Sequence, residues 1–131
     1  MDWPSLIPLE SALIGGFVVH LLTGRRDRSN KRREQRIGYL IDAYRRLEAC
    51  SQRIAPTDTA KLESAVADIQ LFGSPHQVAL VQQFARDFAL EGSASLDALL
   101  QDLRDDLRCE LRLESVPKRI LHLRIENGPG R

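Results

Sequence analysis

The sequence has few cysteines and few aromatic residues. Two cysteines, Cys50 and Cys109, stand among its 131 residues, and Phe, Trp and Tyr together make up 5%. Two cysteines exclude a disulfide scaffold and a four-cysteine zinc site. With 43% hydrophobic and 28% charged residues, the composition is that of a folded protein, and the length predicts a single compact domain.

Common catalytic and cofactor-binding motifs are also missing. The chain has no phosphate-binding P-loop, no dinucleotide-binding glycine fingerprint and no G-x-S-x-G nucleophile elbow. A metal site needs converging ligands at characteristic spacing, whereas His20, His76 and His122 are isolated in the sequence. The sequence therefore predicts no cofactor and no metal site.

The best candidate for catalysis is the acidic run Asp102, Asp105 and Asp106. Residues at this spacing share one face of a helix, and their carboxylates could bind a divalent cation or transfer protons. Arginines at positions 104, 108 and 112 alternate with these acids, however. An ion-paired, solvated helix surface is the favoured interpretation, and the chain is not expected to be an enzyme.

The net charge of +1 conceals an uneven distribution of charge. Residues 1–22 hold two acids and no base, residues 23–36 hold seven bases and two acids, and residues 37–131 hold twelve bases and fourteen acids. The near-neutral total argues against a generally basic nucleic-acid-binding protein. The bases of the middle stretch, called here the basic block, are Arg25, Arg26, Arg28, Lys31, Arg32, Arg33 and Arg36.

The N-terminal stretch predicts a membrane anchor. From Trp3 to Gly24 the only charged residue is Glu10, and a spanning helix needs about 20 apolar residues. Trp3 suits the membrane interface, and Lys and Arg gather on the cytoplasmic side of spans. We therefore expect residues 1–24 to anchor the chain in the inner membrane, N-terminus outside. The alternative is that residues 4–23 pack as the first core helix of a soluble protein.

Two contacts are predicted around this anchor. Trp3 and the basic block should contact the bilayer, where each base near anionic headgroups contributes about 1 kcal/mol. Small residues four positions apart allow close approach of helices and so predict self-association. These possible helix–helix contact residues are Ser11, Ala12, Gly15 and Gly16.

Beyond the basic block, apolar residues recur at helical spacing. The first predicted helix carries the apolar stripe Ile37, Leu40, Tyr44 and Leu47 and ends before Pro56. This helix can continue the anchor as one long stalk, with weak points at Gly24 and Ser29-Asn30. Its stripe suits either pairing between copies or packing on the other helices. A second helix follows from position 57 or 58 to Gly73.

Two more helices complete the predicted body. The third starts with the capping box of Ser74 and Gln77 and stops around Gly92. The fourth buries a leucine stripe from Leu96 to Leu111. After Pro117, apolar and polar residues alternate, which predicts an extended segment lying on the bundle.

The predicted fold is thus all-α. It has a spanning helix, a basic juxtamembrane segment over residues 25–36, a small antiparallel helical bundle over residues 37–126, and a frayed tail over residues 127–131.

The leading functional hypothesis is a single-span membrane protein acting by protein–protein interaction on the cytoplasmic face, with an unknown partner or with itself. The alternative is a soluble helical regulator whose basic segment binds nucleic acid or an acidic partner. No aromatic residues interleave the basic block, so base stacking is not indicated and nucleic acid is the less favoured partner. A third hypothesis, an anchored enzyme using the Asp102–Asp106 face with a divalent ion, is the least favoured.

Overall fold

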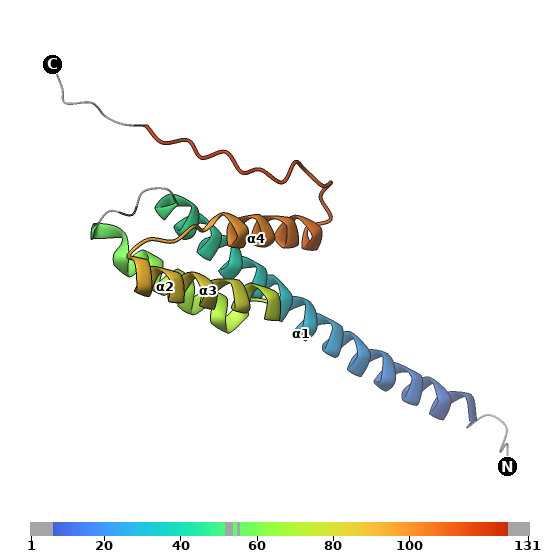
Figure 1. Ribbon diagram of the computed structural model, residues 1–131. Coiled ribbons are helices and arrows are strands. Elements are labelled where there is room, and N and C mark those ends of the chain that lie inside the picture. Colours follow the sequence, from blue (N-terminus) through green and yellow to red (C-terminus); the bar gives the residue numbers. More distant parts are fainter. Residues whose placement is uncertain (1–6, 52–53, 55, 126–131) are drawn as a thin grey trace, which may run out of the picture. The chain divides into compact units, whose positions relative to one another are not determined.

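The fold is all-α, as predicted. The computed structural model describes residues 7–51, 54 and 56–125, with side chains from residue 12 onward. These residues form four α-helices and no strand (Figure 1). The helices are α1 (Ile7–Cys50), α2 (Thr59–Phe72), α3 (Pro75–Glu91) and α4 (Asp97–Glu110), with a 3₁₀ turn, η2 (Pro56–Asp58), before α2. The chain divides into two units, Met1–Gln35 and Arg36–Arg131.

Helix α1 is continuous over 44 residues. It passes without a break through Gly24 and through Ser29 and Asn30, the positions predicted as weak points. Its middle is rich in Arg, Lys, Glu and Gln, which have high helix propensity and compensate for these weaker helix formers. The predicted single stalk is therefore confirmed, although the helix ends at Cys50, earlier than the expected stop before Pro56.

The predicted membrane-spanning helix is wrong. In the part of the chain that the structure describes, no helix is both long enough and apolar enough to cross a membrane. Helix α1 has the length, but its uncharged stretch covers 14 residues, and Arg25, Arg26, Asp27 and Arg28 follow directly in the same helix. A span needs about 20 predominantly apolar residues. The predicted single-pass topology and inner-membrane localisation both depended on this span and are therefore wrong as well.

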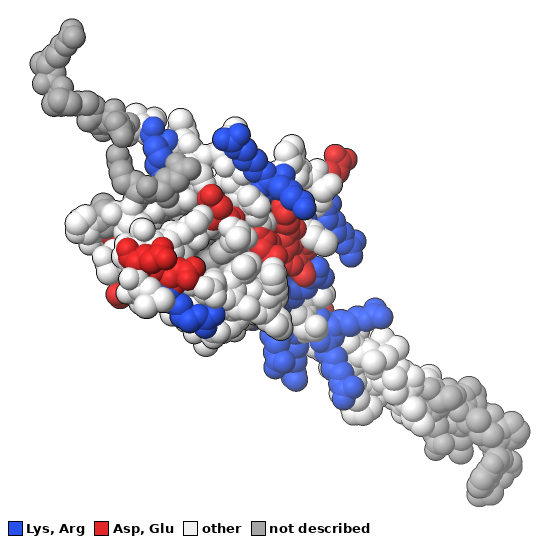
Figure 2. Space-filling model, viewed as in Figure 1, with Lys and Arg blue, Asp and Glu red and all other residues white. Residues whose placement is uncertain are grey.

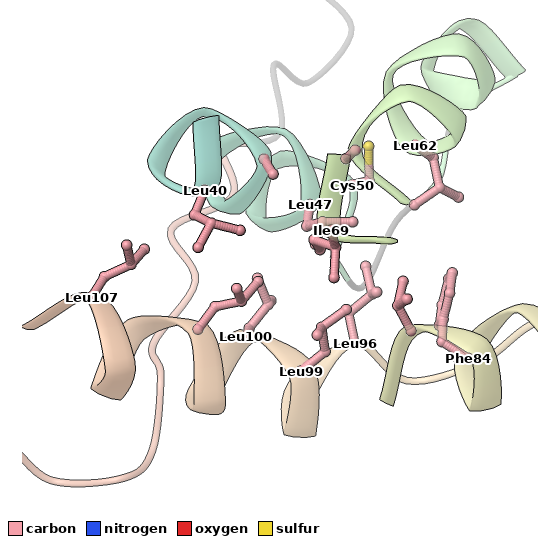
Figure 3. Close-up of a cluster of buried hydrophobic side chains, with 14 residues drawn as sticks. Leu40, Leu47, Cys50, Leu62, Ile69, Phe84, Leu96, Leu99, Leu100 and Leu107 are labelled. Atoms are coloured by element: carbon pink, nitrogen blue, oxygen red, sulfur yellow. The ribbon is translucent and has the colours of Figure 1, made fainter. Parts of the chain in front are cut away.

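The second unit is a helical bundle built around a leucine-rich core (Figure 3). All four helices contribute buried side chains, and Leu96 adds one from the turn before α4. The buried apolar residues are Leu40, Ala43, Leu47, Cys50, Leu62, Ala65, Ile69, Val81, Phe84, Leu96, Leu99, Leu100, Leu103 and Leu107. Each fully buried leucine contributes about 1.5–3 kcal/mol relative to an exposed one.

The apolar stripe in the second part of α1 packs inside this bundle. Leu40 and Leu47 are fully buried and point toward the leucines of α4 (Figure 3), while Ile37 and Tyr44 pack partly buried against the same core. Of the two interpretations of this stripe, packing on the other helices is therefore confirmed. Its residues are not available for coiled-coil pairing between copies.

Helix α3 is bounded as the sequence predicts. The Ser74 hydroxyl accepts a hydrogen bond from the Gln77 backbone N–H at 3.2 Å, and the Gln77 side chain accepts one from the Ser74 N–H at 2.9 Å. These bonds complete the capping box. At the other end, Gly92 adopts a left-handed conformation with φ of 70°, which glycine tolerates without steric penalty.

Helix α4 is shorter at its C-terminal end than the predicted leucine stripe. It begins at Asp97, with the Ser95 hydroxyl accepting from the Asp97 N–H at 3.2 Å, and it ends at Glu110. Leu111, predicted to close the buried stripe, is half exposed because the helix stops before it. The remaining described chain, residues 111–125, forms no helix or strand.

Candidate functional site

The first half of α1 exposes an unusual run of large apolar side chains. Seven of them are between 47% and 69% exposed: Leu13, Ile14, Phe17, Val18, Val19, Leu21 and Leu22. At 3.6 residues per turn, all except Val19 fall on one wide face, and Val19 lies with Ala12 and Gly16 on the opposite, narrower side. We call residues 12–24 the apolar half of α1.

The predicted helix–helix contact residues lie within or beside this apolar half. A Cβ atom added at Gly15 or at Gly16 would meet no atom within 4 Å, and Ala12 is exposed. The side chain of Ser11 lies outside the described residues. The backbone is therefore open to close approach at this point, while the contact itself stays a prediction.

The basic block follows in the same helix. Figure 2 shows Lys and Arg side chains along this part of the chain, next to an uncharged stretch. Six of its seven members are exposed: Arg25, Arg26, Arg28, Lys31, Arg32 and Arg33. Trp3 lies outside the described residues, and the contact of these bases with anionic lipid stays a prediction.

Arg36 differs from the other members of the basic block. It is partly buried, and its Nε donates a hydrogen bond to the Phe72 carbonyl oxygen at 2.7 Å. That oxygen belongs to the last residue of α2, where carbonyls lack partners within the helix. Arg36 therefore caps α2 and belongs to the helical bundle.

A polar cluster around Glu48 fastens the C-terminal segment to α1. Glu48 Oε1 accepts hydrogen bonds from His122 Nδ1 at 2.9 Å and from Arg124 Nη1 at 3.2 Å. Arg124 Nη2 also donates to the carbonyl oxygens of Glu48 and Ser51, the latter at 3.2 Å. The His122 side chain is 2% exposed, and its Nε2 lies 3.4 Å from Ser51 Oγ and 3.9 Å from Asp97 Oδ1. We call these residues the Glu48 cluster and residues 119–125 the tail segment.

The electrostatics of this cluster favour an ionised Glu48. Burial raises the pKa of the carboxyl group, but the hydrogen bonds from His122 and Arg124 and the positive charge of Arg124 outweigh burial. The pKa of Glu48 therefore lies below its ordinary value. An anionic carboxylate accepts stronger hydrogen bonds than a neutral one, so the cluster fixes the tail segment through charge-assisted contacts.

His122 is isolated in the sequence but has partners in the fold. Its partner Glu48 lies 74 positions earlier in the chain, and no local spacing connects the two residues. The only available signal is the alternation after Pro117, which places His122 and Arg124 on one side of an extended chain.

The acidic run is satisfied by neighbouring side chains. Asp106 Oδ2 accepts from the buried Gln77 side chain at 2.8 Å, Asp105 pairs with Arg104 at 3.3 Å, and Asp102 lies 3.6 Å from His76 Nε2. All three carboxylates thus lie near polar partners, and Asp105 pairs with one of the alternating arginines. Among the described residues, no group of three His, Cys, Asp or Glu side chains could hold a metal ion.

The two thiols occupy different surroundings. Cys50 is buried in the core, and this burial raises the pKa of its thiol, which favours the protonated form. Cys109 is exposed on α4, and both cysteines are free. Cys50 fits the predicted role of a small apolar side chain, whereas Cys109 does not contribute to the core.

Two surfaces are thus candidates for binding: the apolar half of α1 with its basic neighbours, and the tail segment held by the Glu48 cluster. Comparison of the chain with protein-family models, with curated proteins and with solved structures found no match.

Proposed function

We propose that this chain is a protein–protein interaction module that assembles with a second copy of itself through the apolar half of α1. The observation that carries the proposal is the exposure of seven large apolar side chains on a single helical stretch. Contiguous apolar surface of this kind marks interaction sites, because its burial removes apolar area from water.

The shape of this stretch suits a helical partner. Side chains four positions apart, such as Phe17 and Leu21 or Ile14 and Val18, form ridges that fit between the ridges of another helix. The opposite side carries Gly15 and Gly16, which leave open space around the backbone. A second copy brings an equally apolar helix of the same length.

Charge favours an antiparallel arrangement of the two copies. Parallel pairing would set one basic block beside the other, and like charges repel. An antiparallel overlap that sets Phe17 opposite Val18 of the other copy instead sets Glu10 opposite Arg25. The acidic N-terminal stretch then lies along the basic block, an attraction that salt partly screens.

Sedimentation of the full chain tests the proposal. The wild type is expected to form dimers or larger assemblies, and the double variant Phe17→Glu with Leu21→Glu is expected to sediment as a monomer. Both changes are on exposed helix surface, so circular dichroism should show unchanged helix content. Leu90→Glu is the matched control, because Leu90 is 85% exposed on α3 and lies outside the apolar half. A monomeric wild type, or a double variant that still assembles, would refute the proposal.

The nucleic-acid alternative is separated by a second measurement. A short labelled DNA duplex is titrated with the wild type and with the double variant at several salt concentrations. We expect no tight binding, because the basic block serves protein contact. Tight binding by both proteins that weakens steeply with salt would assign the basic block to phosphate contacts and contradict the role proposed for its charge.

A further inference from the structure

The tail segment presents its apolar side chains to solvent. Leu121, Leu123 and Ile125 are 81%, 80% and 74% exposed, whereas His122 and Arg124 between them point into the Glu48 cluster. Successive side chains of an extended chain point to opposite sides, so the polar side is fastened to the bundle and the apolar side is uncovered. This is the reverse of the arrangement that burial of apolar area would favour in an isolated chain.

The backbone of the tail segment is also open. Within the described part of the chain, residues 114–125 form no hydrogen bond between backbone groups. The carbonyl oxygens of Pro117 and Lys118 accept from Arg104, and that of Leu123 accepts from Arg124. An extended backbone with unpaired N–H and C=O groups is a template for pairing with another strand.

The segment is held in place before any partner arrives. Ile120 packs partly buried against the core, and the Glu48 cluster fixes residues 122 and 124. Holding an extended segment in its binding conformation removes part of the entropy lost on association. A hollow of about 320 Å³ lies beside it, lined by Asp97, Gln101, Arg119, Ile120, Leu121 and His122.

We propose that the tail segment is a docking strand, to which a partner protein adds an extended segment by β-strand pairing. The outward side offers Arg119 followed by three apolar side chains, and residues 112–125 carry four bases against one acid. The complementary partner segment therefore carries three apolar side chains and, opposite Arg119, a carboxylate. Backbone hydrogen bonds supply affinity in this mode, and the alternate side chains supply specificity.

A second copy of this chain does not fit beside the tail segment in the same way. His122 contacts Glu48 on α1 and lies 3.9 Å from Asp97 on α4, so both helices lie beneath the segment. Paired strands are about 4.8 Å apart, whereas a helix with its side chains is about 10 Å across. The helices beneath the second copy's strand would overlap those of the first, which favours a partner segment without such a body beneath it.

Fluorescence anisotropy with a capped, labelled peptide tests this surface. The probe Val-Thr-Val-Thr-Val-Thr-Glu, paired antiparallel, places its valines against Leu123, Leu121 and Ile125 and its glutamate against Arg119. The full wild-type chain is expected to bind it saturably. Leu123→Pro should weaken binding at least tenfold, because proline removes a backbone donor. Leu90→Ser is the control, because Leu90 is an equally exposed leucine that lies on α3, outside the tail segment. This variant should bind the peptide as the wild type does.

A charge exchange keeps the test independent of folding. Arg119→Glu should weaken binding of the glutamate peptide and strengthen binding of a peptide ending in lysine. The proposal is wrong if the wild type and Arg119→Glu bind both peptides equally, or if Leu123→Pro binds as tightly as the wild type. It is also wrong if the wild type shows no saturable binding.

The proposal is separable from assembly through α1. The Phe17→Glu and Leu21→Glu double variant should bind the glutamate peptide as the wild type does, since its tail segment is unchanged. If Leu123→Pro instead abolishes self-assembly in sedimentation, a second copy covers the tail segment and the proposal of a partner strand is wrong.

Discussion

Removal of the Glu48 carboxylate should release the tail segment from α1. Glu48→Ala deletes the acceptor of two hydrogen bonds, from His122 Nδ1 at 2.9 Å and Arg124 Nη1 at 3.2 Å. Arg124 keeps its bonds to the backbone carbonyls of Glu48 and Ser51, but His122, with its side chain 2% exposed, loses its closest acidic partner.

The magnitude follows from these contacts. A hydrogen bond to a charged group contributes about 1.5–3 kcal/mol. The Glu48 side chain is 30% exposed, so water screens part of this interaction, and the contacts retained by Arg124 reduce the loss further. A net weakening of about 2 kcal/mol corresponds to an opening equilibrium raised roughly 30-fold at 1.36 kcal/mol per factor of ten.

Limited trypsin digestion measures this opening. Cleavage after Arg119 and Arg124 follows the population of the released segment when opening and closing are fast relative to cleavage. We expect Glu48→Ala to accelerate both cleavages by roughly the factor given by the opening equilibrium, with cleavage inside the basic block unchanged as an internal reference. Glu91→Ala, on an exposed glutamate at the end of α3, is the matched control. Equal cleavage rates in Glu48→Ala and wild type would refute the assignment of the cluster as the fastening of the tail segment.

Four further predictions concern the bundle. The pKa of Glu48 is lowered in the folded chain, so the stability that its carboxylate contributes is complete above the ordinary carboxyl pKa of about 4.3 and is lost as pH falls through the lower folded value. The difference in thermal stability between the wild type and Glu48→Gln should therefore disappear at acidic pH. A difference that stays constant with pH would contradict this prediction. Gly73→Ala should destabilise by about 1–3 kcal/mol in urea unfolding, because the new Cβ would lie 2.5 Å from the Ile69 carbonyl oxygen; Gly38→Ala, with open space in the interior of α1, should instead stabilise by about 1 kcal/mol. Ser74→Ala should cost about 0.5–2 kcal/mol by removing the cap of α3, and an unchanged midpoint would show that the capping box contributes little.

Local chemistry made much of the bundle predictable from the sequence. Ser74 and Gln77 are in one capping box, and Gly92 ends α3, so both bounds follow from residues close together in the chain. The buried face of α4 follows from the spacing of its leucines, which helical periodicity places on one side.

The failures share a different physical cause. The inward side of the tail segment depends on Glu48, distant in sequence, and the role of Arg36 depends on the free carbonyl of Phe72 at the end of another helix. The predicted membrane span is wrong because the stretch from Trp3 to Gly24 includes Glu10, and its uncharged run covers only 14 residues before Arg25. Periodicity identifies a face; it does not identify what covers that face.

The central claim is that two copies pair antiparallel through the apolar half of α1. Two chains with one introduced cysteine each test it most directly: Ile14→Cys and Leu21→Cys, each with Cys109→Ser to remove the exposed native thiol, while the native Cys50 stays buried in the core. In the proposed overlap position 14 of one copy faces position 21 of the other, and both lie at the centre of the apolar face, so mixing the two chains under mild oxidation should give the mixed disulfide as the main product. Disulfides only between identical chains would show parallel pairing. If no disulfide-linked dimer forms at concentrations at which a lysine crosslinker joins wild-type chains, assembly through this helix is contradicted.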